Sequence, residues 1–324
     1  MLSFDHLCAL FFESLTITNH APGTIQGYRC AIRKFWTFVQ SIGIEKIEEI
    51  TRETVRDYQV YLAEGKNEKG KLYRVTAQNN LLKGVIYLFR YICDNDYLVK
   101  DPTRGIKFAR EPKTLPRNIL SQVEVKNILE QPDIHLPIGY RNRAILELLY
   151  STGIRASELR FIDLNDINRH DSVLLIRQGK GKKDRYVPIG RSAHQFIEGY
   201  VDHIRPGLLK GKANDALFIT KDGNRIGNTA LDKLIRKYAR LAGIKKVVSC
   251  HTWRHTCATH LVNNGMDIRH VQALLGHSSL DSTQIYTRVA IKDLKRVIKK
   301  HHPREKQIRD QIRDQARDLT VPGI

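Results

Sequence analysis

The chain has 324 residues, of which 41% are hydrophobic and 27% charged, a balance that excludes a largely disordered or fibrous protein and favours two domains over one. Lys and Arg number 54 against 34 Asp and Glu, so the formal net charge is +20. A polyanion is the natural partner. Nucleic acid is favoured over a membrane surface, because no apolar run approaches the ~20 residues that span a bilayer.

The N-terminal stretch and the cysteines indicate a cytoplasmic protein. Residues Leu2 to Leu15 are apolar but include Asp5 and Glu13 and lack a basic leader, so they predict a helix and not a signal peptide. The five cysteines are an odd, widely spaced set, unlike a disulfide framework. We therefore expect a reducing environment and no membrane association.

The first third of the chain predicts a helical domain over residues 1–108. From Thr24, apolar side chains recur at three- and four-residue steps as far as Val39, and Gly43 can end that helix. Further helices are predicted to start near Thr51 and near Thr76. Residues 109–118 then lose the periodicity and carry prolines and basic side chains, which predicts an interdomain linker that either contacts phosphate or is merely solvated.

A second domain, of mixed α and β structure, is predicted over residues 119–300. Ser121 and Glu124 form a capping-box pattern before a helix. Two β-prone runs, 173–177 and 185–189, flank a glycine-rich basic tip and predict a β-hairpin, and residues 216–220 are expected to add a strand. The predicted fold class is therefore mainly α with a small β-sheet.

Residues 301–324 form a C-terminal tail with a short repeat. Gln307 to Asp310 and Gln311 to Asp314 both read Q-I-R-D. Ile308, Ile312 and Ala316 then share one helical stripe, too narrow to hold a helix alone. The tail is expected either to pack on another surface or to fray.

The first motif that bears chemistry is T-G-I-R-A-S-E-L, from Thr152 to Leu159. It places a glycine turn before Arg155, at the start of a helix. By itself the motif is weak, because an arginine at a helix start is most often a solvated surface residue.

The second motif, H-T-W-R-H, places His251 and Arg254 three residues apart and therefore on one helical face, where they can bind one phosphate. The spacing of its two histidines resembles a zinc metalloprotease pattern, but the glutamate of that pattern is absent. Cys250, Cys257 and His260 keep zinc open as an alternative. Packing is the commoner role for a cysteine in such apolar surroundings.

The third motif begins with Leu274 and ends a helix at Gly276, with His277 directly after the glycine. Tyr286 follows in the sequence T-Q-I-Y-T. A single tyrosine at such a position is usually a packing residue whose hydroxyl is exposed to solvent. The ordered series of an arginine, a lysine hairpin, His-x-x-Arg, Gly-His and a tyrosine is much less expected by chance.

With these motifs the chain resembles the tyrosine recombinase (phage integrase) family, and within it the Xer-like bacterial members, over both domains. The resemblance implies a helical, SAM-like core-binding domain followed by a catalytic domain. It implies a site-specific recombinase or integrase that cleaves and rejoins DNA through a 3′-phosphotyrosyl link. The catalytic residues that it implies are Arg155, Lys180, His251, Arg254, His277 and the nucleophile Tyr286, with Glu158 in support.

Two points of this match stay open. Lys182 and Lys183 lie in the same hairpin tip as Lys180 and are alternative candidates for the acting lysine. Trp253 replaces a smaller apolar residue of the family pattern, and we expect it to alter packing more than chemistry.

The chemistry of these residue types agrees with the resemblance. Phosphodiester cleavage builds negative charge on the non-bridging oxygens, and arginine forks stabilise that charge without a metal ion or another cofactor. His251 is the candidate base for the tyrosine, and Lys180 the candidate acid for the departing 5′ oxygen.

The expected partner is double-stranded DNA carrying a recombination site, bound by a homo- or hetero-tetramer on two sites. A type IB topoisomerase-like enzyme and a DNA-binding protein without catalysis are the alternatives.

Overall fold

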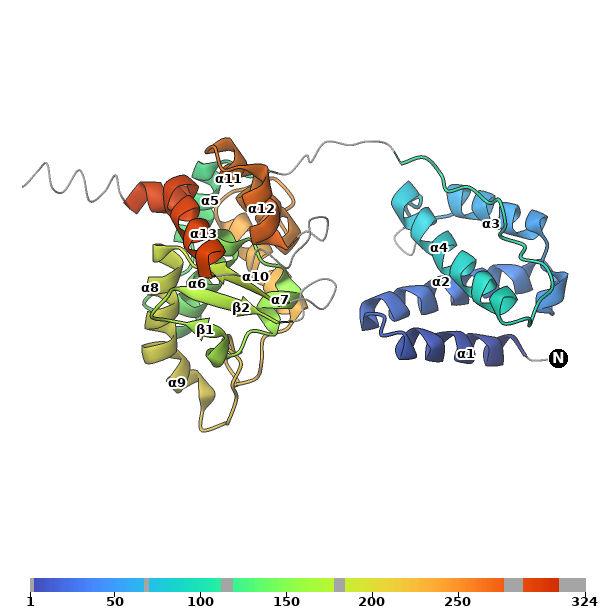
Figure 1. Ribbon diagram of the computed structural model, residues 1–324, viewed down its shortest axis with the longest axis horizontal. Helices are drawn as coiled ribbons and strands as arrows, with labels where there is room; N and C mark the ends of the chain where they lie inside the picture. The colour runs from blue at the N-terminus through green and yellow to red at the C-terminus, as the bar shows by residue number, and fades with distance from the viewer. Residues whose placement is uncertain (1–2, 67–69, 112–118, 178–183, 277–287, 309–324) are drawn as a thin grey trace, which may run out of the picture. The chain divides into compact units, whose positions relative to one another are not determined.

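The computed structural model describes residues 3–66, 70–111, 119–177, 184–276 and 288–308, except for the side chains of residues 288–292. The chain divides into two compact units, Met1–Leu115 and Pro116–Ile324, and each is described by itself (Figure 1). Within the described ranges, no helix is long and apolar enough to cross a membrane.

The first unit is helical. Its elements are α1 (Phe4–Ile17), α2 (Pro22–Ser41), the 3₁₀ helix η1 (Ile47–Glu49), α3 (Arg52–Glu64) and α4 (Val75–Asp94). The expected helices are confirmed, with starts within two residues of those predicted. Thr51 caps α3 because its hydroxyl accepts a hydrogen bond from the backbone N–H of Thr54 at 3.3 Å.

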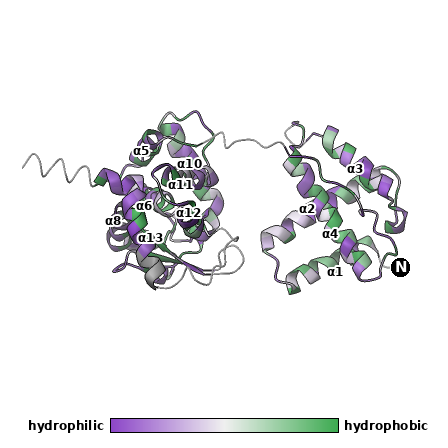
Figure 2. Cartoon of the chain, turned by 45° about the horizontal axis from the view of Figure 1, so that its top comes forward, coloured by the Kyte–Doolittle hydropathy of each residue, from purple (hydrophilic) through white to green (hydrophobic). Residues whose placement is uncertain are grey.

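The core of the first unit is aromatic. The ring of Phe35 in α2 packs edge-on against Tyr58 of α3 and Phe89 of α4, with centroids 5.0 and 6.0 Å apart. A Cβ on Gly84 of α4 would lie only 2.7 Å from the Cβ of Ala31 in α2, so the glycine allows these two helices to cross closely. The helices accordingly show apolar and polar faces in Figure 2.

The second unit combines helices with a small sheet. Its elements are α5 (Gln122–Glu130), α6 (Pro137–Thr152), α7 (Ala156–Arg160), η2 (Leu164–Asp166), β1 (Ile167–Asn168), β2 (Val173–Ile176), β3 (Arg185–Pro188), α8 (Arg191–Gly199), the π-helical turn η3 (Tyr200–Ile204), α9 (Arg205–Leu209), α10 (Asn228–Leu241), α11 (Cys250–Asn263), α12 (Ile268–Leu275) and α13 (Arg288–His301). Ser121 and Glu124 form the predicted capping box at α5.

The sheet is antiparallel with the order β1-β2-β3. Val173 pairs with Pro188 and Ile176 with Arg185, which confirms the predicted hairpin strands. The expectation of a strand at residues 216–220 is wrong, since that segment forms only isolated bridges and β1 is the third strand. Residues 216–219 are all buried, so the segment packs into the core and not along a sheet edge.

Helix α6 is the centre of the second unit. It is buried almost all round, and Trp253 of α11 packs on it, fully buried, with its indole N–H donating to the carbonyl of Leu146 at 3.2 Å. Trp253 also lies edge-on to Tyr150. Trp253, which replaces a smaller residue of the family pattern, therefore packs α11 against α6, and the expected packing role is confirmed.

Candidate active site

Arg155 lies just beyond a tight turn at the end of α6. Gly153 ends that helix with φ +60°, a conformation that favours glycine. A Cβ there would also lie 2.7 Å from Leu275 and 3.3 Å from Cys257, so any side chain would push α11 and α12 away. The chain then reverses so that Arg155 becomes the N-cap residue of α7, which matches the predicted glycine turn and helix start.

The guanidinium of Arg155 pairs with Glu158 one turn later. Its Nη1 atom lies 2.8 Å from Oε1 of Glu158, and its backbone N–H donates to Oε2 at 2.8 Å. A second arginine, Arg185 of β3, binds both oxygens of the same carboxylate. Burial raises the pKa of Glu158, but the hydrogen bonds and charges of the two arginines outweigh it and hold the pKa below its usual range. Glu158 is therefore ionised at neutral pH.

Arg254 approaches the same place from α11. Its two terminal nitrogens donate to the carbonyls of Gly153 and Leu275, each at 2.7 Å. These carbonyls lie at the C-terminal ends of α6 and α12, where the helix dipole favours a cation. Burial, followed by the charge of Arg155, lowers the pKa of Arg254 to about 10, so the side chain remains charged at neutral pH.

The two predicted arginines meet at the turn that ends α12. Arg254 binds the carbonyl of Leu275, and Arg155 donates to the carbonyl of Gly276 at 3.4 Å. Gly276 has φ +65° and ends α12 as predicted. The structure thus brings Arg155 and Glu158 together with Arg254, which is far from them in sequence, directly before position 277.

His251 lies one turn before Arg254 on α11 and is exposed. Its ring stands edge-on to that of His255, with centroids 4.9 Å apart. Partial burial lowers the pKa of His251, and the charges of His255, Arg254 and Arg155 lower it further. The imidazole is therefore predominantly neutral at pH 7 and available as a proton acceptor.

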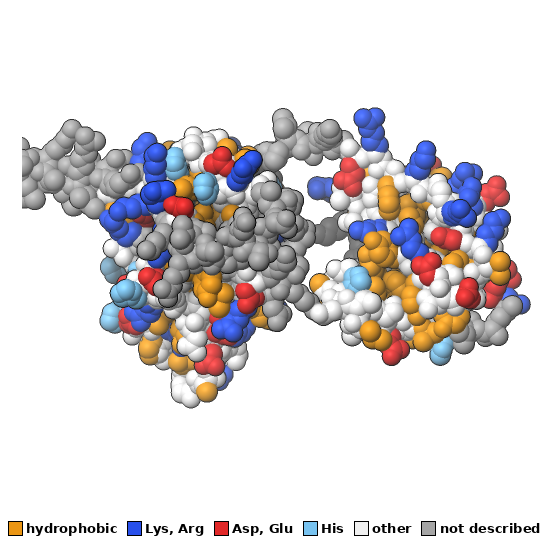
Figure 3. Space-filling model, in the orientation of Figure 1, with side chains coloured by type: hydrophobic (Ala, Val, Ile, Leu, Met, Phe, Trp, Pro, Cys, Tyr) orange, Lys and Arg blue, Asp and Glu red, His pale blue; other side chains and the backbone are white. Residues whose placement is uncertain are grey.

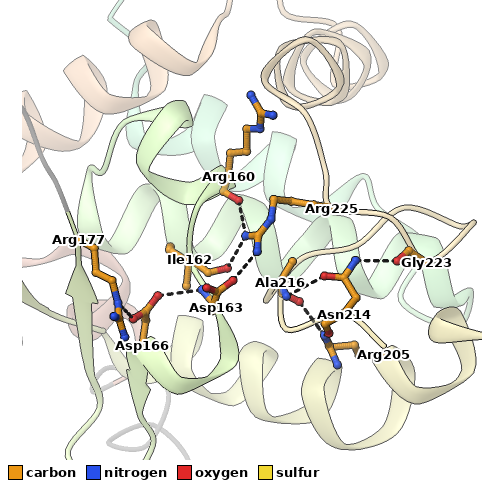
Figure 4. A network of polar contacts seen from close by, with 10 residues as sticks. All are labelled: Arg160, Ile162, Asp163, Asp166, Arg177, Arg205, Asn214, Ala216, Gly223 and Arg225. Atoms are coloured by element: carbon orange, nitrogen blue, oxygen red, sulfur yellow. Dashed lines mark hydrogen bonds and ion pairs between the residues drawn. The ribbon is translucent and has the colours of Figure 1, made fainter. Parts of the chain in front are cut away.

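The base of the hairpin is held by polar contacts (Figure 4). Arg177, just after β2, donates to the buried carboxylate of Asp166 at 2.5 Å. Arg225 binds Asp163 and the carbonyl of Arg160, which ties the loop after α7 to the segment that follows residue 216. The contact of Arg177 with Asp166 thus fixes the end of β2, and Lys180 follows it in the sequence.

Three of the six predicted residues lie outside the described part of the chain. Lys180 falls between β2 and β3, His277 follows the last residue of the α12 turn, and Tyr286 precedes α13 by two residues. Lys182 and Lys183, the alternatives to Lys180, also lie outside the described residues.

The alternative zinc residues are engaged in packing. Both ring nitrogens of His260 have protein partners, the hydroxyl of Tyr150 at 2.7 Å and the carbonyl of Leu120 at 2.8 Å. Burial raises the pKa values of Cys250 and Cys257 to about 12, so neither thiol is a thiolate at neutral pH. In the described ranges, no group of three His, Cys, Asp or Glu residues is arranged to hold a metal ion.

Sequence reasoning missed Arg185, which is buried beside Glu158 at 3% exposure. The available signal was the alternation of β3, because Arg185 shares a strand face with Val187, which belongs to the core. A charged residue on the core face of a strand requires a buried partner.

Comparison with known proteins adds to this geometry. Residues 118–293 match the phage integrase family, and residues 7–98 match its N-terminal SAM-like domain. The tyrosine recombinase XerD of Yersinia pestis is 39% identical over 91% of this chain and 96% of its own length. The tyrosine recombinase XerC 2 of Ralstonia nicotianae is 35% identical over 92% of this chain and 86% of its own.

Solved structures show the same fold. The XerH recombinase bound to its difH substrate is 22% identical, with a TM-score of 0.63 over 90% of this chain and 84% of that one. A lambda integrase dimer bound to a COC′ core site is 15% identical, with a TM-score of 0.64 over 89% of this chain and 98% of that one.

The helical unit, the mixed unit and the paired arginines together define a tyrosine-type DNA strand-exchange enzyme. The chain belongs to the phage integrase family, with Xer tyrosine recombinases among its relatives, and it is a site-specific DNA recombinase.

Proposed function

We propose that this recombinase cleaves DNA by attack of the Tyr286 hydroxyl on a backbone phosphate. In this proposal Arg155 and Arg254 bind the non-bridging oxygens, His251 accepts the tyrosine proton, Lys180 protonates the departing oxygen and His277 donates a hydrogen bond to the phosphate. The observation that carries the proposal is the meeting of Arg155 and Arg254 at the turn of Leu275 and Gly276.

The net positive charge at this turn favours a phosphate in the transition state of its transfer. Three arginines, Arg155, Arg185 and Arg254, surround one carboxylate, Glu158, which leaves a net charge of +2 (three positive charges and one negative). The transition state carries more negative charge than the substrate, and cations fixed in advance stabilise it without reorganising. Planar guanidinium groups also match the oxygens of a phosphate.

Two proton transfers complete the cleavage step. A tyrosine with an ordinary pKa of about 10 is a poor nucleophile at neutral pH, and neutral His251 can take its proton as the bond from oxygen to phosphorus forms. The bond from phosphorus to the 5′ oxygen breaks, and Lys180 gives that oxygen a proton. The product is a 3′-phosphotyrosyl link and a free 5′ hydroxyl, and attack by a 5′ hydroxyl of another strand reverses the step without ATP.

The test is a covalent adduct on nicked DNA. The probe is a duplex that the protein selects from a random-sequence pool. A series of probes carries one nick each, at successive positions of the selected site. Cleavage near the nick releases a short fragment that bears the free 5′ hydroxyl, and its loss prevents religation. Wild-type protein is expected to form an adduct that survives a denaturing gel, and Tyr286→Phe none. Tyr186→Phe removes the hydroxyl of an exposed tyrosine on β3 and should leave the yield unchanged. An equal yield from Tyr286→Phe would refute the nucleophile.

We further propose that four subunits act on two DNA sites, as a homo- or hetero-tetramer in the cytoplasm. In the proposed division, residues 1–108 form the core-binding domain, 109–118 the linker, 119–300 the catalytic domain and 301–324 the tail. Support for DNA as partner comes from the two solved structures, which are bound to a difH substrate and to a COC′ core site, and from the Lys and Arg side chains spread over the surface in Figure 3. The five cysteines, all free, support a reducing compartment.

The start of the tail is anchored on its own catalytic unit. The ring of His302 is fully buried and bonds the carbonyl of Tyr150 at 3.1 Å, while Glu305 accepts the backbone N–H of Arg191 at 2.5 Å. Arg304 pairs with Glu147 at 2.7 Å. The polar contacts of the catalytic unit therefore extend past residue 300, and a segment that reaches a neighbouring subunit has to begin after them.

We propose that the stripe of Ile308, Ile312 and Ala316 docks on such a neighbour; Ile312 and Ala316 lie outside the described residues. Deletion of the residues after Lys306 keeps the anchor, so single-site DNA binding is expected to stay within about twofold of wild type, while pairing of two sites falls at least tenfold, about 1.4 kcal/mol. Gel-shift assays with one and two labelled sites measure both. An equal loss in both assays would contradict the proposal.

A further inference from the structure

Glu158 is shared between two arginines that differ in their surroundings. Oε1 accepts from Arg155 at 2.8 Å and from Arg185 at 2.9 Å, and Oε2 accepts from Arg185 and from the backbone N–H of Arg155, both at 2.8 Å. The side chain of Arg155 is 28% exposed, whereas that of Arg185 is 4% exposed. Arg155 can therefore reach a substrate phosphate, and Arg185 is enclosed behind it.

This sharing decides how much positive charge Arg155 presents. A carboxylate paired with Arg155 alone would neutralise it and compete with the phosphate for its donors. Because Arg185 binds both carboxylate oxygens in a fork-to-fork pair, Glu158 is largely neutralised by Arg185. Arg155 is then held in position by Glu158 while much of its charge remains available.

Arg185 also contacts the turn before His277. A Cβ on Gly276 would lie 2.9 to 3.0 Å from three atoms of the Arg185 guanidinium, so the glycine is needed for this close approach as well as for its φ. Arg185 is also the first residue of β3, directly after the tip that contains Lys180. Its Nε is buried and has no acceptor among the residues that the structure describes.

We propose that Arg185 is a positioning residue for strand cleavage, which neutralises Glu158 so that Arg155 presents its charge to the phosphate, and which fixes the hairpin base against the Gly276 turn. The inference rests on the proposed role of Arg155 in binding the phosphate. Because its side chain is only 4% exposed, Arg185 is proposed to act through Glu158 and Arg155 and not by binding the phosphate itself.

The test compares single-turnover cleavage of the nicked duplex by wild type, Arg185→Met and Arg185→Lys. Arg185→Met is expected to lower the cleavage rate by about 10–100-fold. A loss of this size is typical when the removed residue orients a side chain that itself binds the reacting group. DNA binding by gel shift should stay within about threefold, and Arg185→Lys should recover part of the rate because it keeps the charge. Arg205→Met serves as the matched control, because Arg205 is also buried but donates to the carbonyls of Asn214 and Ala216, away from Glu158; it should cleave at the wild-type rate.

A double-substitution cycle separates positioning from general damage. If Arg185 acts through Arg155, then adding Arg185→Met to Arg155→Ala should cost less than about threefold more in cleavage rate. The inference would be overturned if the cleavage rate of the double variant fell by the product of the two single losses. It would also be overturned if Arg185→Met cleaved as fast as the control. If Arg185→Met does not fold, Arg185→Lys and Gly276→Ala, which displaces the guanidinium, take its place in the cycle. Failure of wild type to form any adduct would refute the proposed function instead.

Discussion

Replacement of Arg254 by alanine is expected to lower the rate of strand cleavage by at least about 10²–10³-fold, since loss of one fixed donor to a developing oxyanion has that cost. Arg254 is central because it is held by two helix-end carbonyls and lies beside Arg155. Single-turnover cleavage of the nicked duplex at saturating protein measures this loss separately from DNA affinity. Arg254→Lys should remain impaired, because an ammonium cannot bond both carbonyls and a phosphate with the geometry of a guanidinium.

A matched control exists within the same unit. Arg205 is likewise buried and likewise donates to backbone carbonyls, those of Asn214 and Ala216, but these lie in a structural loop. Arg205→Ala should lower stability and leave the cleavage rate of the folded protein within about threefold of wild type. If the two variants lost equal cleavage activity, Arg254 would have a structural role only.

Glu147→Gln is expected to lower the free energy of unfolding by about 3–5 kcal/mol, the cost of removing one partner from a buried ion pair. The carboxylate of Glu147 is 1% exposed and pairs with Arg143 at 2.9 Å and Arg304 at 2.7 Å. Glutamine has the same shape but no charge, so two arginines would be left without their counter-ion. Urea denaturation followed by circular dichroism measures the change.

The exposed pair of Arg169 and Asp202 is the control for this experiment. Both side chains are about 40% exposed, at 42% and 41%, and an ion pair on the surface contributes little. Asp202→Asn should therefore leave the midpoint of urea unfolding nearly unchanged. An equally small change for Glu147→Gln would show that the tail anchor does not depend on the buried charge.

Much of the local structure was predictable because its causes are local. Thr51 and Ser121 begin helices through side-chain oxygens that bond backbone N–H groups within the next turn. Gly153 and Gly276 end helices through a left-handed conformation that glycine adopts freely. The strand predicted at residues 216–220 was wrong because a short apolar run has the same sequence pattern in a sheet and in an irregular segment of the core.

The sequence by itself determined the family through the order of its motifs, and the resemblance to that family implied one site for Arg155, Glu158 and Arg254. Those assignments came from the match of each motif to the family pattern. The net charge of +20 also indicated a nucleic acid as partner.

Only the tertiary structure decided how the charges in that site are divided. Glu158 and Arg185 of this site are 27 residues apart, so no sequence periodicity links them. The same holds for the ion pair of the tail anchor, since Glu147 and Arg304 are 157 residues apart. A buried ion pair depends on which two surfaces exclude water together, and that is a property of the packed core. The alternation of β3 could place Arg185 on the core face of its strand, but only the tertiary structure shows that its partner is Glu158.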